Sequence, residues 1–166
     1  MKKLYVILLV VLASLIAAST AIAQPTNFVA HLSGSGEVPS VATTATGQAV
    51  LHLNASGTEL DFMLMVANID DVTQAHIHCG AADVAGPVVV FLYGFGPVVS
   101  PNGVLAQGTR GAGNVIPRPS SAACPGGVAN FAELIAKMQS GDAYVNVHTV
   151  VNPGGEIRGQ IRPAGP

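Results

Sequence analysis

The sequence is poor in charge, since only 10% of its 166 residues are Asp, Glu, Lys or Arg. Its few basic residues form no cluster, which argues against a nucleic-acid partner, because phosphate binding requires grouped lysines and arginines. No serine or cysteine lies in a nucleophile elbow of the kind that hydrolases use, and no pair of carboxylates is visibly placed for general acid–base catalysis. These absences make an enzyme the less favoured interpretation.

Cysteine is also scarce, and the two present are Cys79 and Cys124. In an exported protein an even pair most simply forms one disulfide. That bond would close a loop of 45 residues and stabilise the fold by about 4 kcal/mol on the chain-entropy model. The alternative is a thiolate metal ligand, because Cys79 adjoins His78.

The one long hydrophobic run lies at the N-terminus. A basic start at Lys2 and Lys3, an uncharged apolar middle and a small-residue ending predict a signal peptide, residues 1–23, cleaved before Gln24. A retained membrane anchor is the alternative, but an apolar run of about 15–20 residues is short for a spanning helix with firm flanks. We expect residues 24–166 to form a single secreted or periplasmic domain, free of the membrane. Without the two leader lysines its net charge is −4, from five basic and nine acidic residues.

Alternation of apolar and polar residues predicts strands through most of this domain. The expected strands are residues 28–32, 48–54, 60–66, 74–80, 87–93, 144–149 and 156–162. Short strands separated by turn signals favour a mainly β fold, an antiparallel β-sandwich or barrel of about eight strands.

One short helix and one irregular region complete the expected fold. Asn130 and Glu133 resemble a capping box, apolar residues follow at helical spacing, and Gly141 can end the helix. Residues 94–127 are rich in glycine and proline and carry only weak strand signals around 103–107. We expect a long surface excursion here, tied down by its cysteine.

Three of the five histidines lie in two short strand-like runs, Gln74–Gly80 and Tyr144–Thr149. Alternation places His76 and His78 on one face of the first run, opposite its apolar residues. His148 lies in the second run. If the two strands are close in the fold, the three imidazoles would converge.

Converging imidazoles suit copper or zinc, which bind nitrogen ligands at about 2.0–2.1 Å. The candidate metal ligands are therefore His76, His78 and His148, with Glu37 or Glu156 completing the shell. The alternative is that the histidines hydrogen-bond across the sheet and hold the fold, because a buried polar group without a partner costs about 1–3 kcal/mol.

Three motifs follow one another in a characteristic order. They are Leu32-Ser33-Gly34-Ser35-Gly36-Glu37-Val38-Pro39 with Ala45-Thr46-Gly47, Ala75-His76-Ile77-His78-Cys79-Gly80 with Gly86-Pro87-Val88-Val89, and Tyr144-Val145-Asn146-Val147-His148-Thr149 through Asn152-Pro153-Gly154-Gly155-Glu156-Ile157-Arg158-Gly159-Gln160-Ile161. In this order they resemble the CHRD family, the domain named after its repeats in chordin. One departure is Ser40, where the family often has a second proline.

The resemblance implies an exported β domain. Chordin itself carries several copies and cysteine-rich modules, which this sequence lacks, so growth-factor binding does not carry over. A weaker likeness is to copper-zinc superoxide dismutase, which also has a His-x-His strand, a distant third histidine and a nearby disulfide. No second ligand cluster for a zinc site accompanies it here.

Two functions remain open. The first is a non-enzymatic interaction module for an extracytoplasmic protein or matrix partner. The second is a histidine-based copper or zinc protein with a dismutase-like architecture.

Overall fold

The computed structural model describes residues 25–94 and 96–165 of the chain. Within them it contains nine strands, one α-helix and two single-turn 3-10 helices. The strands are β1 (Asn27–Ser33), β2 (Thr46–Leu53), β3 (Glu59–Ala67), β4 (Val72–Cys79), β5 (Val88–Tyr93), β6 (Gly103–Gly111), β7 (Ala143–Thr149), β8 (Ile157–Gln160) and β9 (Arg162–Pro163). Helix α1 (Phe131–Ser140) lies between β6 and β7, and the 3-10 turns are η1 (Gly34–Gly36) and η2 (Ala112–Asn114).

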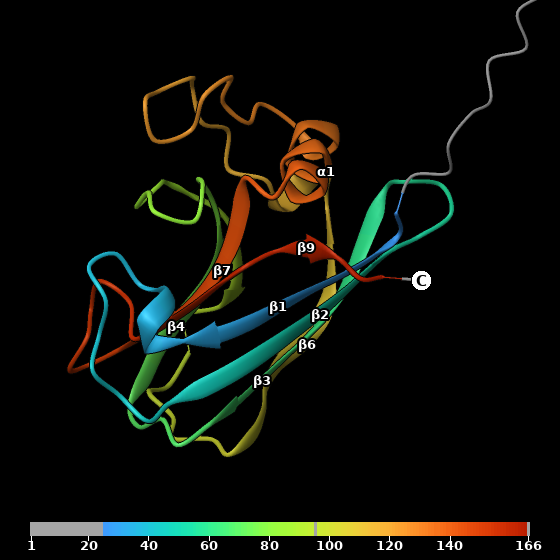
Figure 1. Cartoon of the computed structure of the whole chain (residues 1–166). Helices are drawn as coiled ribbons and strands as arrows, with labels where there is room; N and C mark the ends of the chain where they lie inside the picture. Colours follow the sequence, from blue (N-terminus) through green and yellow to red (C-terminus); the bar gives the residue numbers. More distant parts are fainter. Residues whose placement is uncertain (1–24, 95, 166) are drawn as a thin grey trace, which may run out of the picture.

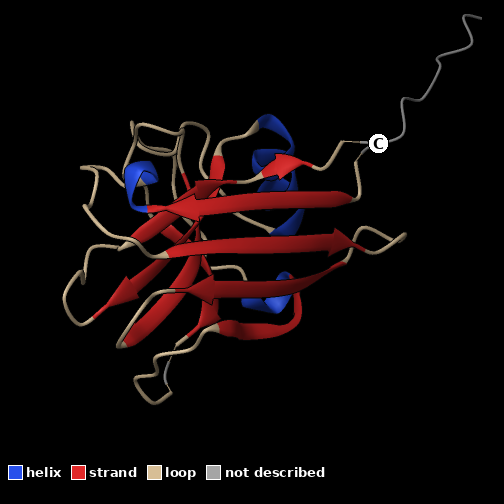
Figure 2. Cartoon of the chain, turned by 60° about the horizontal axis from the view of Figure 1, so that its bottom comes forward, coloured by secondary structure: helices blue, strands red, loops and turns tan. Residues whose placement is uncertain are grey.

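The strands form one antiparallel sheet in the order β5-β4-β7-β8-β1-β2-β3-β6, and the short β9 pairs with β1. The sheet curls until β6 approaches β5, which makes a nearly closed barrel (Figures 1 and 2). Arg110 on β6 bridges this seam, because its Nε and Nη2 donate to the carbonyls of Phe91 and Leu92 on β5 at 2.8 and 3.1 Å. Two acceptors of a strand edge are thereby satisfied. The predicted fold class is confirmed.

The barrel interior follows the alternation seen in the sequence. On β2, Ala49, Leu51 and Leu53 are buried, whereas Val50 and His52 are exposed. β2 and β3 pair antiparallel as a hairpin, from Thr46↔Ala67 to Leu53↔Leu60. Inward-facing residues of β1, β3, β4 and β7 fill the same core: Phe28, Ala30, Leu32, Leu60, Phe62, Leu64, Val66, Ala75, Ile77, Val145 and Val147.

The prediction of a long surface excursion over residues 94–127 is wrong in part. Nine of these residues form β6, which pairs with β3 from Glu59↔Gly111 to Val66↔Gly103, with a bulge at Leu64/Met65. Three glycines and mostly exposed side chains leave β6 without any alternation. Its backbone hydrogen bonds to β3, not its side chains, make it a strand.

Helix α1 begins and ends as predicted. The side chain of Asn130 accepts from the Glu133 backbone N–H at 3.0 Å, and the Glu133 carboxylate accepts from the N–H of Ala129 at 2.6 Å. Gly141 ends the helix with a φ of 78°, which glycine adopts without strain. The apolar stripe of the helix faces the core with Phe131, Leu134, Ile135 and Met138.

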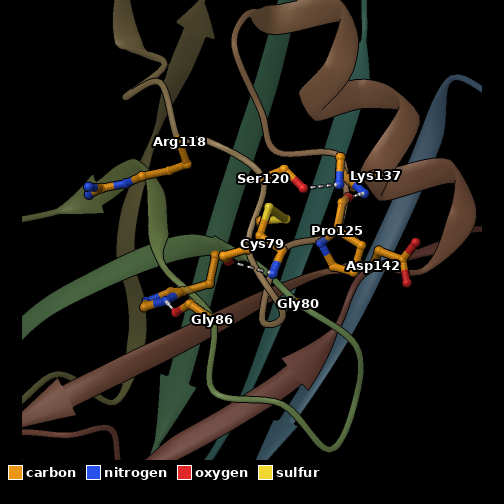
Figure 3. Close-up of a disulfide and its surroundings, with 12 residues drawn as sticks. Cys79, Gly80, Gly86, Arg118, Ser120, Pro125, Lys137 and Asp142 are labelled. Atoms are coloured by element: carbon orange, nitrogen blue, oxygen red, sulfur yellow. Dashed lines mark hydrogen bonds between the residues drawn. A yellow bond between two sulfur atoms is a disulfide. The ribbon is translucent and has the colours of Figure 1, made fainter.

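The predicted disulfide is present between Cys79, at the end of β4, and Cys124, in the segment before α1. Both residues are fully buried. Figure 3 shows how the Cys124 segment is tied to its surroundings: Lys137 on α1 donates to the carbonyl of Pro125 at 2.6 Å, and the Gly126 N–H donates to Ser120 Oγ at 3.0 Å. The alternative of a Cys79 thiolate ligand is therefore wrong.

The described part of the chain contains no helix with the length and apolar character needed to cross a membrane. The predicted signal peptide, residues 1–23, and its cleavage before Gln24 lie outside the described residues. They stay predictions.

Loops cover the outer face of β4 and β7, where the histidines lie. The loop that follows β1 and the loop between β7 and β8 run side by side at the left of Figure 1, in light blue and orange-red. Glu156 joins them, because its carboxylate accepts from the hydroxyls of Thr43 and Thr149 at 2.8 and 2.7 Å. From the other side, the loop after β4 reaches the same face through Gly86, whose N–H donates to the Tyr144 hydroxyl at 3.0 Å.

Candidate metal centre

The structure brings His76, His78 and His148 together on the outer face of the barrel. On β4, Ala75 and Ile77 point into the core, so the two histidines between and after them point outward. β7 pairs antiparallel with β4 and contributes His148. One nitrogen from each ring lies within 4.8 Å of the others.

The closest pair is His76 Nδ1 and His148 Nε2, which are 3.0 Å apart. The His78 ring centroid lies 5.5 Å from that of His76 and 6.1 Å from that of His148. Two nitrogens bound to one ion at about 2.0–2.1 Å lie roughly 2.9–3.4 Å from each other. The 3.0 Å pair therefore has the spacing of two ligands of one ion, and also that of a hydrogen bond.

Backbone carbonyls fix the tautomers of two of the rings. His78 Nδ1 donates to the Gly86 carbonyl at 2.8 Å, and His148 Nδ1 donates to the Pro153 carbonyl at 2.9 Å. A neutral imidazole carries one proton, so Nε2 of both rings keeps its lone pair. Without an ion, His76 Nδ1 must then donate to His148 Nε2, which leaves a lone pair on His76 Nε2 as well.

Burial keeps the three rings neutral. Loss of water, together with repulsion from His148 and His78, lowers the pKa of His76 to about 3. Burial, with smaller contributions from the charges of His148 and Arg158, lowers the pKa of His78 to about 4, although the hydrogen bond to the Gly86 carbonyl acts to raise it. The pKa of His148 is lowered by burial too. At neutral pH the three rings therefore carry no positive charge, and Nε2 of each keeps a lone pair; metal binding requires neutral imidazoles.

Aromatic and cationic groups support the cluster from one side. The Tyr144 ring stacks on His78, with centroids 4.8 Å apart and planes at 14°. The Arg158 guanidinium carbon lies over the Tyr144 ring, 3.4 Å from its centroid. Arg158 Nη2 donates to the Ala81 carbonyl at 2.6 Å. Phe91 meets the ring of His76 edge-on at 4.4 Å. The sequence analysis assigned neither Tyr144 nor Arg158 to the site, although alternation along the Tyr144–Thr149 run puts Tyr144 on the same face as His148.

The two predicted carboxylate ligands have different environments. Glu156 lies outside the group of converging nitrogens, and its oxygens accept from Thr43, Thr149 and Asn152. It therefore acts as a loop anchor. Glu37 is also outside that group, but it is buried on the same side of the molecule. Burial raises the pKa of Glu37 to about 7, against the opposing effects of Arg158 and Asn146.

Comparison with known proteins identifies the chain by family alone. Residues 28–161 match the family model of the CHRD domain. No curated protein and no solved structure matches the chain.

Proposed function

We propose a function for this chain, which belongs to the CHRD domain family. It is a non-enzymatic extracytoplasmic binding domain whose ligand is a copper or zinc ion held by His76, His78 and His148. One observation carries this proposal. The ring nitrogens of three neutral histidines, two buried and one half-buried, approach within 4.8 Å of one another, while backbone carbonyls hold two of the rings by their other nitrogen.

This arrangement has the form of an oriented metal site. Histidines that bind metals nearly always donate their second ring N–H to a carbonyl or carboxylate, which fixes the tautomer and the direction of the lone pair. His78 and His148 do so through Gly86 and Pro153. Imidazole is a common ligand for zinc and copper. An ion bound here would replace the His76–His148 hydrogen bond, and the proton of His76 would then sit on Nε2 of the same neutral ring.

The disulfide and the CHRD domain fit an extracellular protein. Together with the predicted leader, they favour export to the periplasm or the cell exterior. A structural role for the three histidines predicts a different property. In that case their hydrogen bonds would stabilise the metal-free fold, and added ions would have no effect.

The decisive measurement is the metal content of protein purified without a histidine tag, followed by titration with Cu²⁺ and Zn²⁺. We expect about one ion per chain and a rise in melting temperature. Ligand at 100 times its Kd stabilises by about 2.7 kcal/mol, which corresponds to roughly 5–10 °C for a domain of this size. If the protein contains no stoichiometric ion and its melting temperature does not change on addition of Cu²⁺ or Zn²⁺, the proposal is wrong.

Matched variants separate this site from other histidines. His76→Ala/His148→Ala should lose the ion and the thermal shift. His31→Ala/His52→Ala removes two exposed histidines outside the cluster and should keep both. If His78→Ala lowers the melting temperature sharply in chelator-treated protein and wild type binds no ion, the histidines are part of the scaffold.

A further inference from the structure

Buried acceptors without donors gather around the histidine cluster. Among the described residues, five buried side-chain atoms have no hydrogen-bond partner, and four of them are Glu37 Oε1, His76 Nε2, His78 Nε2 and Asn146 Oδ1. Each of these four residues is less than 9% exposed. Native proteins leave few buried polar atoms unpaired, and such atoms call for a ligand, a water or an ion.

Asn146 links the carboxylate to the histidines. It lies on β7 directly opposite His76 on β4, and opposite Arg158 on β8. Its side chain is within hydrogen-bonding reach of both the Glu37 carboxyl and the His78 ring, yet its Oδ1 finds no donor of suitable geometry. The amide therefore stands between a buried acid and a buried imidazole.

Gly155 makes room for this arrangement. A Cβ at that position would lie 2.5 Å from Glu37 Oε1 and 2.7 Å from Asn146 Nδ2, so any larger residue would push the acid and the amide apart. Its φ of 127° also favours glycine. The pocket that opens above is about 250 Å³ and is lined by Glu37, Val38, Pro39, Val41 and residues 151–155. Glu37 thus lies between this pocket and the Asn146 amide.

The charge of a bound ion must be compensated here. Three neutral imidazoles contribute no charge to a divalent ion, and the Arg158 guanidinium beside Tyr144 adds another positive charge. Buried charges are stable only when paired. Glu37 is a buried carboxylate on this face with an oxygen that lacks a partner, whereas Glu156 is fully hydrogen-bonded.

Building on the proposed function, we infer that Asn146 supplies an oxygen ligand beside the three histidines and that Glu37 balances the charge of the ion. An amide oxygen and a nearby carboxylate are hard donors, which favour divalent ions over the soft Cu⁺. The site therefore selects Cu²⁺ or Zn²⁺.

The test compares affinities for Zn²⁺, Cu²⁺ and Cu⁺, each measured against a competing chelator in untagged full-length protein. Glu37→Gln and Asn146→Ala should each weaken binding of the divalent ions by about 10–100-fold, the usual effect of losing such a partner. Binding of Cu⁺ should change much less. Glu59→Gln makes the same charge change at an exposed position on β3, and Asn102→Ala removes an exposed amide. Both controls should bind like wild type.

A further variant distinguishes the loss of a ligand from a loss of the fold. Asn146→Asp keeps the shape of the side chain and adds a negative charge, so it should bind the divalent ions more tightly than wild type. Wild-type affinity for every ion in folded Glu37→Gln, Asn146→Ala and Asn146→Asp would overturn this inference alone. Failure of wild type to bind any ion would instead reject the proposed function, and this inference with it.

Discussion

Removal of the disulfide should destabilise the domain chiefly by raising the conformational entropy of the unfolded chain. The bond joins residues 45 positions apart, and closing a loop of that size removes unfolded-state entropy worth about 4 kcal/mol at 25 °C. The native segment around Cys124 has other attachments: the N–H of Arg118 donates to the Val128 carbonyl at 2.7 Å and Arg118 Nε to the Val88 carbonyl at 2.7 Å. We therefore expect the double variant Cys79→Ala/Cys124→Ala to fold into the same structure with a lower stability.

Thermal unfolding in the absence of metal measures this effect. A loss of about 4 kcal/mol corresponds to roughly 8–16 °C for a domain of this size. Alanine is the better replacement, because both cysteines are fully buried and a serine hydroxyl there would add a desolvation cost. Urea unfolding supplies the free energy independently of temperature.

Burial of the bond adds a kinetic expectation. Because neither sulfur is exposed to solvent, reductant added to the folded protein should leave the bond intact until the domain unfolds. Titration of thiols in denatured, unreduced protein should find none. The reasoning is refuted if the double variant melts within about 2 °C of wild type, or if reductant opens the bond in native buffer as fast as in denaturant.

Four further outcomes follow from the outer face and the seam. Gly155→Ala should destabilise by about 2–3 kcal/mol, because its Cβ would meet the Glu37 carboxyl at 2.5 Å, whereas Gly154→Ala adds a methyl group to open space and should have little effect by urea titration. In chelator-treated protein, the lowered pKa of His76 makes its contribution to stability disappear as pH falls from 6.5 toward 3, since the unfolded chain binds the proton more readily. The raised pKa of Glu37 acts in the opposite sense, so its contribution is present below pH 4.5 and lost as pH rises through about 7; urea midpoints across pH should show this falling component in wild type and not in Glu37→Gln. Arg110→Met keeps the aliphatic stem of the side chain but removes the Arg110 donors to two β5 carbonyls, which should cost about 1–3 kcal/mol and speed hydrogen exchange in β5.

Much of the fold could be predicted because its strands bury one face. Alternation in β2 and β3 marked the inward residues correctly, and the capping pair Asn130 and Glu133 marked the start of α1. β6 was missed because a strand that is mostly exposed on both faces has no alternation, and its three glycines suggest a loop. The pairing of β6 with β3 is a tertiary contact, made by backbone hydrogen bonds between two segments that are distant in the sequence.

The histidine cluster shows the same limit at the level of a site. Alternation predicts that His76 and His78 share a face, but no local pattern indicates that β7 pairs with β4. His76 and His148, which this pairing brings together, are 72 residues apart in the sequence. The sequence does not distinguish the environments of Glu37 and Glu156, because each directly follows a glycine-rich turn.

That difference arises from loop packing. Glu156 meets two threonine hydroxyls and becomes an anchor, while Glu37 is folded beneath Gly155 against an amide. Imidazoles and an amide on the outer face of a sheet, with a buried carboxylate oxygen that lacks a partner beside them, bear an energetic cost that folding alone does not require. An apolar face under the same loops would be more stable, so the persistence of these acceptors is the physical reason to look for a cation there.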